Sequence, residues 1–427
     1  MSRRVAVVGS GVAGLSAAHH LRGQAEVTLF EAGDYLGGHA HTVDVTLPSA
    51  NGPVTHGVDT GFLVFNERTY PGLIGLFEQL GVATAKSDMS FSVQIPRGQG
   101  RTPLEWNGAT LNTVFAQRAN LWSPRFWWML REVLRFNRMA TGLALAGDDV
   151  ALAQPLGDFL REHRFGHAFT HWYLLPMLGC IWSCPTDQML QFPVATMVRF
   201  CHNHGLIQVN DRPQWWTVAG GSKHYVEKIA SAVDHVHLNA PVQRVERHAE
   251  GVTLWVGGQS YGFDQVIIAT HADQALAMLG APSEAQQRVL GAFRFHDNEA
   301  VLHTDVRVMP RERRAWAAWN YERSADTSQE HARVCLHYWL NALQPLPFDQ
   351  TVVVSLNPTG EIDPAQVLGR YHYAHPVFDA PAIAAQEAMP SVQGEAGVWF
   401  AGAWMGYGFH EDGFKAGRAA AAGVLAA

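Results

Sequence analysis

The first 31 residues contain the feature that most restricts the fold, a set of three glycines between an apolar run and an alanine-rich segment. Val5–Val8 predicts a strand, Gly9, Gly11 and Gly14 follow at once, and residues 15–21 predict a helix. In such a turn the first glycine allows the reversal, the second lets backbone amides approach a diphosphate, and the third permits close packing of helix and strand. The pattern predicts a dinucleotide cradle at a helix N-terminus.

A second apolar run ends in an acid at the distance that a nucleotide site requires. Val27–Phe30 predicts a strand, and Glu31 follows it about 20 residues after Gly11. A carboxylate there can accept hydrogen bonds from the ribose hydroxyls of an adenosine. Because a bare glycine pattern also occurs by chance in ordinary turns, the flanking strands, helix and acid carry the inference. Together they predict an α/β domain of the Rossmann type.

The segment after Glu31 suggests which dinucleotide is bound. Gly37 and Gly38 form a pair followed by His39, and Gly57–Phe62 contains an Asp and a Gly in a second close turn. Here the chain resembles the flavin amine oxidase and phytoene desaturase superfamily, which implies FAD as the cofactor. Members of that superfamily carry an arginine after the glycine pair. His39 replaces it with a hydrogen-bond donor that is not permanently charged.

The carboxyl end resembles the same superfamily. Val398–Gly402 predicts a strand that ends at a glycine, and a helix begins near Glu411. The resemblance implies that Phe409 flanks the flavin ring and that the His410 amide faces the flavin. A helix N-terminus stabilises the negative charge of a reduced flavin. Family members often have an acid where this chain has Ala403, so only a backbone contact is implied there.

The glycine turn and the resemblance together predict one FAD site assembled from distant segments. Its predicted contact residues are Gly9, Gly11, Val12, Ala13, Gly14, Glu31, Ala32, Gly37, Gly38, His39, Thr60, Gly61, Phe62, Val242, Ala269, Thr270, Gly402, Ala403, Phe409, His410 and Glu411. His410 is also the candidate catalytic residue, as a group that could handle a proton. Amine oxidases often use a lysine, for which Lys86 and Lys223 are candidates by residue type alone.

The expected fold is therefore an FAD-binding domain of the glutathione-reductase type, assembled from discontinuous segments, beside an α+β substrate-binding domain. The FAD-binding domain is predicted to comprise residues 1–65, 206–271 and 386–427. The substrate-binding domain is predicted to comprise residues 66–205 and 272–385.

One segment of the expected substrate domain is rich in aromatic side chains. Leu121–Leu130 leads into Arg131, Arg135 and Arg138, which share one face of a predicted helix. Three interpretations fit this composition: contact with a membrane surface, a core helix with a solvated charged side, or the wall of a tunnel for a long substrate.

Composition limits the remaining options. The formal net charge of −7 provides no general attraction for nucleic acid, and four cysteines are too few for a disulfide framework. His163, His167 and His171 lie four residues apart, as do Cys180 and Cys184, but no further ligands complete a site, so no metal is predicted. No apolar run is long enough to span a bilayer. We expect a cytoplasmic protein, with a peripheral position at the inner membrane face as one option.

The predicted activity follows from the cofactor. We expect an FAD-dependent oxidoreductase, of oxidase, dehydrogenase or desaturase type, that transfers hydride between a hydrophobic substrate and the flavin. The whole chain resembles a bacterial branch similar to the flavoprotein domain of plant cyclopropane fatty acid synthases. This implies an unsaturated or modified fatty acyl substrate and a lipid-modifying enzyme as a partner. Two alternatives stay open: an amine oxidase that produces hydrogen peroxide, and a non-catalytic flavoprotein partner of a lipid-modifying enzyme.

Overall fold

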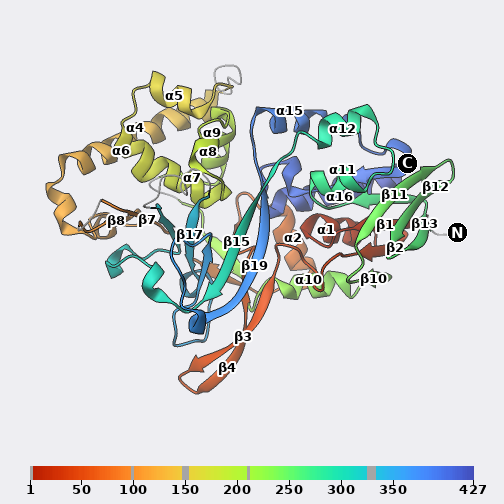
Figure 1. Ribbon diagram of the computed structural model, residues 1–427, viewed down its shortest axis with the longest axis horizontal. Coiled ribbons are helices and arrows are strands. Elements are labelled where there is room, and N and C mark those ends of the chain that lie inside the picture. The colour runs from red at the N-terminus through yellow and green to blue at the C-terminus, as the bar shows by residue number, and fades with distance from the viewer. Residues whose placement is uncertain (1–2, 98–100, 147–152, 209–211, 325–332) are drawn as a thin grey trace.

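The computed structural model describes residues 3–97, 101–146, 153–208, 212–324 and 333–427. A five-stranded parallel sheet lies at the centre of one end of the molecule (Figure 1). The strand order is β10 (His235–His237), β2 (Ala25–Phe30), β1 (Arg3–Val8), β14 (Gln265–Ile268) and β20 (Val398–Phe400). The sheet therefore joins the start, the middle and the end of the chain.

Both faces of this sheet are covered, which explains the uninterrupted apolar runs. Val5 and Val7 face a core that includes α1 (Val12–Leu21) and α16 (His410–Ala426), and Ala6 and Val8 face the opposite core. The two helices can pack closely because Gly417 has no side chain: a Cβ there would lie 2.0 Å from the Ala13 carbonyl oxygen. A three-stranded antiparallel sheet belongs to the opposite core; it contains β11 (Val242–His248), β12 (Gly251–Val256) and β13 (Gln259–Phe263).

A seven-stranded mixed sheet forms the middle of the molecule. Its order is β19 (Val367–Pro376), β15 (Phe295–His303), β18 (Val353–Leu356), β17 (Cys335–Trp339), β16 (Trp319–Glu322), β7 (Phe91–Ile95) and β8 (Leu104–Asn107). All neighbours are antiparallel except β16 and β7. The strand β19 is one edge of this sheet, and with the long strand β15 it lies on the side toward the five-stranded sheet (Figure 1).

Helices make up the end of the molecule that lies opposite the five-stranded sheet (Figure 1). This end contains η1 (Arg118–Trp122), α3 (Leu111–Val114), α4 (Pro124–Ala146), α5 (Leu156–Glu162), α6 (His167–Phe169), η2 (Thr170–Leu174), α7 (Leu175–Trp182), α8 (Thr186–Met189) and α9 (Val194–Asn203). The remaining helices are α2 (Pro71–Leu80), α10 (Lys223–Ala230), α11 (Ala272–Met278), α12 (Glu284–Leu290), α14 (Leu340–Leu343), α15 (Ala380–Ala388), η3 (Val306–Val308), η4 (Arg313–Ala315), η5 (Pro364–Gln366), η6 (Met389–Ser391), η7 (Glu395–Gly397) and η8 (Ala403–Met405).

The structure also contains two small sheets. One is the hairpin of β3 (Thr42–Ser49) and β4 (Gly52–Asp59), and the other contains β5 (Phe65–Asn66), β9 (Trp215–Val218) and β6 (Thr84–Ser87). The end of β4 is fixed by Asp59, a fully buried carboxylate. It accepts hydrogen bonds from the Thr42 hydroxyl, the Ser222 amide and hydroxyl, and the Gln344 side chain, at 2.5 to 3.1 Å.

The predicted fold class, an α/β cofactor domain with an α+β partner, is confirmed. The strands of the five-stranded sheet fall within the segments expected for FAD binding, and those of the seven-stranded sheet fall within the other segments. The sheet of β5, β9 and β6 draws on both groups, and we keep the domain boundaries as a proposal. Within the described residues, no helix has the length and hydropathy needed to cross a membrane.

Asp59→Asn should lower the free energy of unfolding by about 2 kcal/mol, because an amide group would meet donors that now face a carboxylate. Burial raises the pKa of Asp59 to about 6. Urea denaturation should therefore be measured at about pH 8, where the Asp59 carboxyl of the native protein is ionised. Asp349→Asn, at an exposed position, is the control. Equal stability of both variants would contradict the anchoring role of Asp59.

Candidate active site

A cavity of about 700 Å³ lies at the carboxyl ends of the parallel strands. Its wall includes Gly9 and Gly11 after β1, Glu31 after β2, Thr270 after β14 and Gly402 after β20. Ligands of open α/β sheets bind at this edge, where loops from neighbouring strands converge. The cavity continues between this edge and the helical end of the molecule, where the side chains on its wall become aromatic and apolar.

The glycine turn has the geometry that its sequence predicts. Gly9 has a φ of +97°, and its amide donates to the Phe30 carbonyl oxygen at 2.8 Å. A Cβ at Gly14 would lie 1.9 Å from the Gly9 carbonyl oxygen, so only glycine permits this packing of helix and strand. A Cβ at Gly11, in contrast, would meet no atom within 4 Å. Gly11 begins α1 without a side-chain cap and faces open space in the cavity wall.

Glu31 is fixed at the end of β2 by its own loop. Its Oε2 accepts hydrogen bonds from the Ser10 amide at 2.8 Å and the Ser10 hydroxyl at 2.5 Å, and its Oε1 accepts from the Gly33 amide at 2.8 Å. The carboxylate is thus held beside the glycine turn. It is the only charged side chain on the cavity wall among the described residues.

The N-terminus of α16 closes another side of the cavity. Phe409 and His410 lie on the wall, and the Asp412 carboxylate accepts hydrogen bonds from the Tyr407 and Phe409 amides at 3.1 and 3.0 Å. Burial raises the pKa of Asp412 to about 6. The first turn of α16 is therefore held rigidly at the wall.

His410 is packed rather than placed for acid–base chemistry. Its ring stacks on Phe62 with centroids 3.7 Å apart, and its Nε2 hydrogen-bonds with the Tyr225 hydroxyl at 3.2 Å. Burial lowers the pKa of His410 to about 3, so the imidazole is neutral and a very weak base at neutral pH. These contacts do not favour the catalytic role that the sequence suggested.

His39 occupies the position where the superfamily has arginine, and it is uncharged. Its ring lies 5.4 Å from that of His375 and 6.3 Å from that of His271, measured between centroids. Burial and these neighbours lower the pKa of His39 well below its ordinary value. Its Nε2 is buried and has no hydrogen-bond partner among the described residues, although the residue lies on the cavity wall. An unpaired buried nitrogen is costly unless a ligand satisfies it.

The structure brings most of the predicted FAD contacts onto one wall. The predicted contacts that line the cavity are Gly9, Gly11, Val12, Ala13, Glu31, Ala32, Gly38, His39, Gly61, Phe62, Val242, Ala269, Thr270, Gly402, Ala403, Phe409 and His410. Contact of each one with FAD stays a prediction.

Four predicted contacts, Gly14, Gly37, Thr60 and Glu411, do not line this wall, and their contact with FAD stays a prediction. Gly14 lies behind the turn against Gly9, and Gly37 supports the loop, with a φ of +113°. The Thr60 hydroxyl hydrogen-bonds with the Tyr373 hydroxyl at 2.6 Å. The Glu411 carboxylate accepts from the amides of residues 72 and 73, at the start of α2. All four positions support the wall.

An aromatic group at the far end of the cavity was missed by the sequence analysis. Phe200 stacks on Phe409 and on His204, with centroids 4.7 and 3.9 Å apart, and Tyr70 and Trp215 lie on the same wall. Phe200 and His204 lie one turn apart at the end of α9, whereas Tyr70, Trp215 and Phe409 come from other segments of the chain. No local signal groups residues from such distant segments.

The other candidate residues lie elsewhere. Lys223 pairs with Asp44 at 2.5 Å and Lys86 is exposed on β6, so neither lysine lines the cavity. His167 and His171 stack on each other at 4.2 Å. Burial raises the pKa values of Cys180 and Cys184, as expected for buried thiols.

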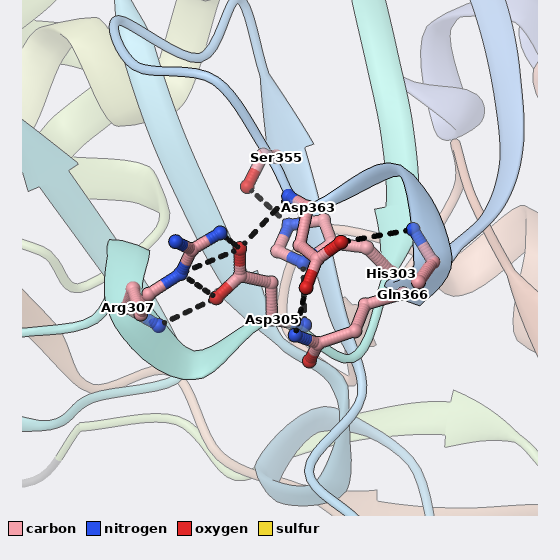
Figure 2. Close-up of polar contacts among 7 residues, drawn as sticks. His303, Asp305, Arg307, Ser355, Asp363 and Gln366 are labelled. Atoms are coloured by element: carbon pink, nitrogen blue, oxygen red, sulfur yellow. Dashed lines mark hydrogen bonds and ion pairs between the residues drawn. The ribbon is translucent and has the colours of Figure 1, made fainter.

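A second polar cluster lies outside the cavity wall. Glu322, Cys335 and His337 place three ligand-type atoms within 4.8 Å of one another. A chain of hydrogen bonds reaches them: the Asp305 amide donates to His303 Nδ1, His303 Nε2 donates to Ser355 Oγ, and Ser355 donates to His337 Nδ1. Figure 2 shows the part of this chain around His303 and Ser355. His337 Nε2 then donates to Glu322 at 2.9 Å. These donors and acceptors satisfy one another, and the absence of a metal stays a prediction.

Comparison with known proteins assigns the family. The model for flavin containing amine oxidoreductases matches residues 12–301, more than half of the chain. The chain belongs to this family. The expected superfamily, the FAD cofactor and the class of FAD-dependent oxidoreductase are thereby confirmed.

Individual relatives are distant. A Mycobacterium tuberculosis protein named "Putative flavin-containing monoamine oxidase AofH" is 28% identical over 268 residues, which is 58% of this chain and 53% of the relative. The chain thus spans about half the length of this curated family relative. Cyclohexylamine oxidase from Brevibacterium oxydans has a similar fold, with a TM-score of 0.70, 17% identity and coverage of 100% and 99% of the two chains. A fatty acid isomerase from P. acnes also has a similar fold, with a TM-score of 0.68, 14% identity and coverage of 98% of this chain and 97% of the isomerase chain.

The residues on the wall fit the family's cofactor. Uncapped amides at the start of α1 suit a diphosphate, the space beside Gly11 admits it, and Glu31 lies where an adenosine ribose requires an acceptor. The unpaired Nε2 of His39 offers a further contact. This fit rests on the geometry of the chain alone.

Gly11→Ala should fold normally but bind FAD at least about tenfold more weakly, because the new methyl group would enter the cradle without meeting protein atoms. Gly14→Ala should instead destabilise the fold, since its Cβ would collide with the Gly9 carbonyl oxygen. Thermal unfolding and FAD titration separate the two effects. Native FAD affinity of Gly11→Ala, or unfolding of both variants, would contradict the assignment of the cradle.

Glu31→Gln should weaken FAD retention by about tenfold, because the amide provides one acceptor oxygen where the carboxylate provides two. The measurement is equilibrium dialysis of the yellow protein, with circular dichroism as the check on folding. Glu26→Gln, an exposed acid on the same strand, is the matched control. Equal retention by both variants would count against a ribose contact at Glu31.

Proposed function

We propose that this protein transfers hydride between FAD and a neutral, hydrophobic substrate, specifically an unsaturated or modified fatty acyl chain. The observation that supports the proposal is the lack of charge on the cavity wall. Apart from Glu31, which is engaged by Ser10 and Gly33, no Asp, Glu, Lys or Arg lines the cavity among the described residues.

The histidines on the wall do not change this balance. Burial lowers the pKa of His204 and of His375 to about 4, and it lowers the pKa of His271 as well. With His39 and His410, all five wall histidines are neutral at neutral pH. A protonated amine would lose its hydration here and find no carboxylate at the aromatic end. An acyl chain carries no such cost.

The aromatic end also suits a chain by its surface. Ile181, Leu206 and Met89 join Phe200 and Trp215 on the wall, so the wall offers apolar contacts from several elements. Burial of apolar surface contributes about 25 cal/mol per Å². Such contacts can hold a long apolar substrate without a charged anchor.

When bound, FAD supplies the hydride acceptor or donor. The chain's own residues orient and enclose the reactants: the glycine turn and Glu31 hold the adenosine end, and the aromatic wall excludes water and aligns the substrate.

The main rival is an amine oxidase, which the family name and the curated relative favour. The structural neighbours include both an amine oxidase and a fatty acid isomerase, so the fold alone does not distinguish the two substrates. The wall, on which Glu31 is the only charged side chain and no lysine lies among the described residues, favours the acyl substrate. A non-catalytic flavoprotein is the third possibility, in which no substrate changes the flavin.

Anaerobic titration of the FAD-loaded protein tests the proposal. Acyl lipids should bleach the oxidised flavin absorbance, or unsaturated lipids should restore it after reduction, and simple amines should do neither. Bleaching by amines with release of hydrogen peroxide in air would contradict the proposal. A flavin that responds to neither class would instead favour the non-catalytic alternative.

A pair of variants connects the response to the wall. Ile181→Glu should weaken the lipid response by roughly tenfold, because it places a carboxylate among apolar contacts. Ile383→Glu replaces a partly buried isoleucine on α15 that does not line the cavity, and it should leave the response unchanged. An equal response of both variants to lipid would contradict binding of the lipid substrate at this wall.

A further inference from the structure

The helical end of the molecule exposes an unusual group of large apolar side chains. Of the 13 large apolar residues that are exposed in the described chain, six lie between residues 111 and 134. We call these six the tryptophan face; the exposed fractions are Leu111 79%, Leu121 41%, Trp122 88%, Trp127 50%, Trp128 53% and Leu134 56%. Soluble proteins rarely expose such residues together without a binding role.

Contacts between elements make this a single surface. The Trp127 indole donates to the Leu121 carbonyl oxygen at 2.9 Å, which joins α4 to η1. The Trp127 ring also lies 5.0 Å, between centroids, from the ring of Phe115, the residue that follows α3. Along α4, Trp127, Arg131 and Leu134 follow at spacings of four and three residues, so they share a helix face. The opposite side of α4 is buried through Phe126 and Phe136.

The same segment is strongly basic. Residues 111–138 contain five arginines and one acid, in a chain whose formal net charge is −7. The acid, Glu132, is buried and accepts a hydrogen bond from the Gly166 amide at 3.0 Å. Four of the arginines are exposed, at positions 118, 125, 131 and 138. The Arg131 guanidinium lies over the Trp128 ring, 5.2 Å from its centroid, and Arg138 follows seven residues later on the same face of α4. Positive charge and tryptophan therefore share this surface of an acidic protein.

We propose that the tryptophan face docks on an anionic phospholipid bilayer. Tryptophan favours the interface between headgroups and acyl chains, and arginine can extend its charge to phosphate while its stem contacts lipid. Trp122 projects with 88% of its surface exposed, which suits a bilayer because a protruding ring needs no preformed pocket there. Charge complementarity selects anionic lipid over neutral lipid.

The position of the face is consistent with a substrate from the bilayer. Helix α4 packs against α9, and α9 contributes Phe200 to the aromatic end of the cavity. The face therefore lies one helix layer away from that end. Docking is independent of the chemistry proposed above, since vesicle binding is measured without turnover.

Co-sedimentation of the FAD-loaded protein with vesicles tests the proposal. Phosphatidylcholine vesicles that contain phosphatidylglycerol should bind the protein, vesicles of phosphatidylcholine alone should bind it much more weakly, and added salt should release it. The double variants W122A/W128A and R131Q/R138Q should each weaken binding to the anionic vesicles by at least about tenfold.

Matched variants at other exposed positions are the controls. Trp255→Ala on β12 and Arg288→Gln on α12 should bind like the native protein, and retained flavin colour verifies folding. Failure to bind anionic vesicles, or an equal effect of Trp255→Ala, would overturn the proposal. So would a dimer in light scattering that W122A/W128A converts to a monomer, because the face would then cover a second copy of the chain.

Discussion

The parallel pairing of β1 with its neighbours is the constraint on which the site depends. β1 pairs with β2 and β14, and β14 pairs with β20, so segments near residues 9, 31, 270 and 402 end at one edge of one sheet. Parallel strands require crossover connections, which place helices on the faces of the sheet and leave loops at its carboxyl edge. The tight contact between Gly9 and Gly14 fixes the first of these loops. The cavity is a consequence of this arrangement.

Local features of the sequence predicted this edge, because each has its own physical signature. Gly9 needs a positive φ, Gly14 permits a contact that a Cβ would block, and Glu31 follows a strand. The aromatic end was not predicted, since only tertiary packing brings Phe200 and Trp215 to one wall. The same limit applies to Glu411: its sequence position suggests cofactor contact, but its carboxylate caps α2 instead. The burial that makes His410 a weak base could not be predicted from the sequence either.

Two surfaces of opposite character follow from the same chain. The cavity wall excludes charge, with five neutral histidines and a single engaged carboxylate, whereas the tryptophan face combines exposed indoles with arginines. An uncharged interior suits an uncharged substrate, and a basic aromatic exterior suits the surface of an anionic bilayer. The sequence analysis left three interpretations open for residues 121–130. The structure divides the segment, burying Phe126 and Met129 in the core and exposing the tryptophans.

The measurement that tests the account most directly is the uptake of FAD by the purified, folded chain. Both ends of the sequence form one cavity, so titration of the apoprotein should saturate at one FAD per chain, with the visible absorbance of a bound flavin. A well-folded protein that stays colourless and takes up no FAD under these conditions would contradict the central claim.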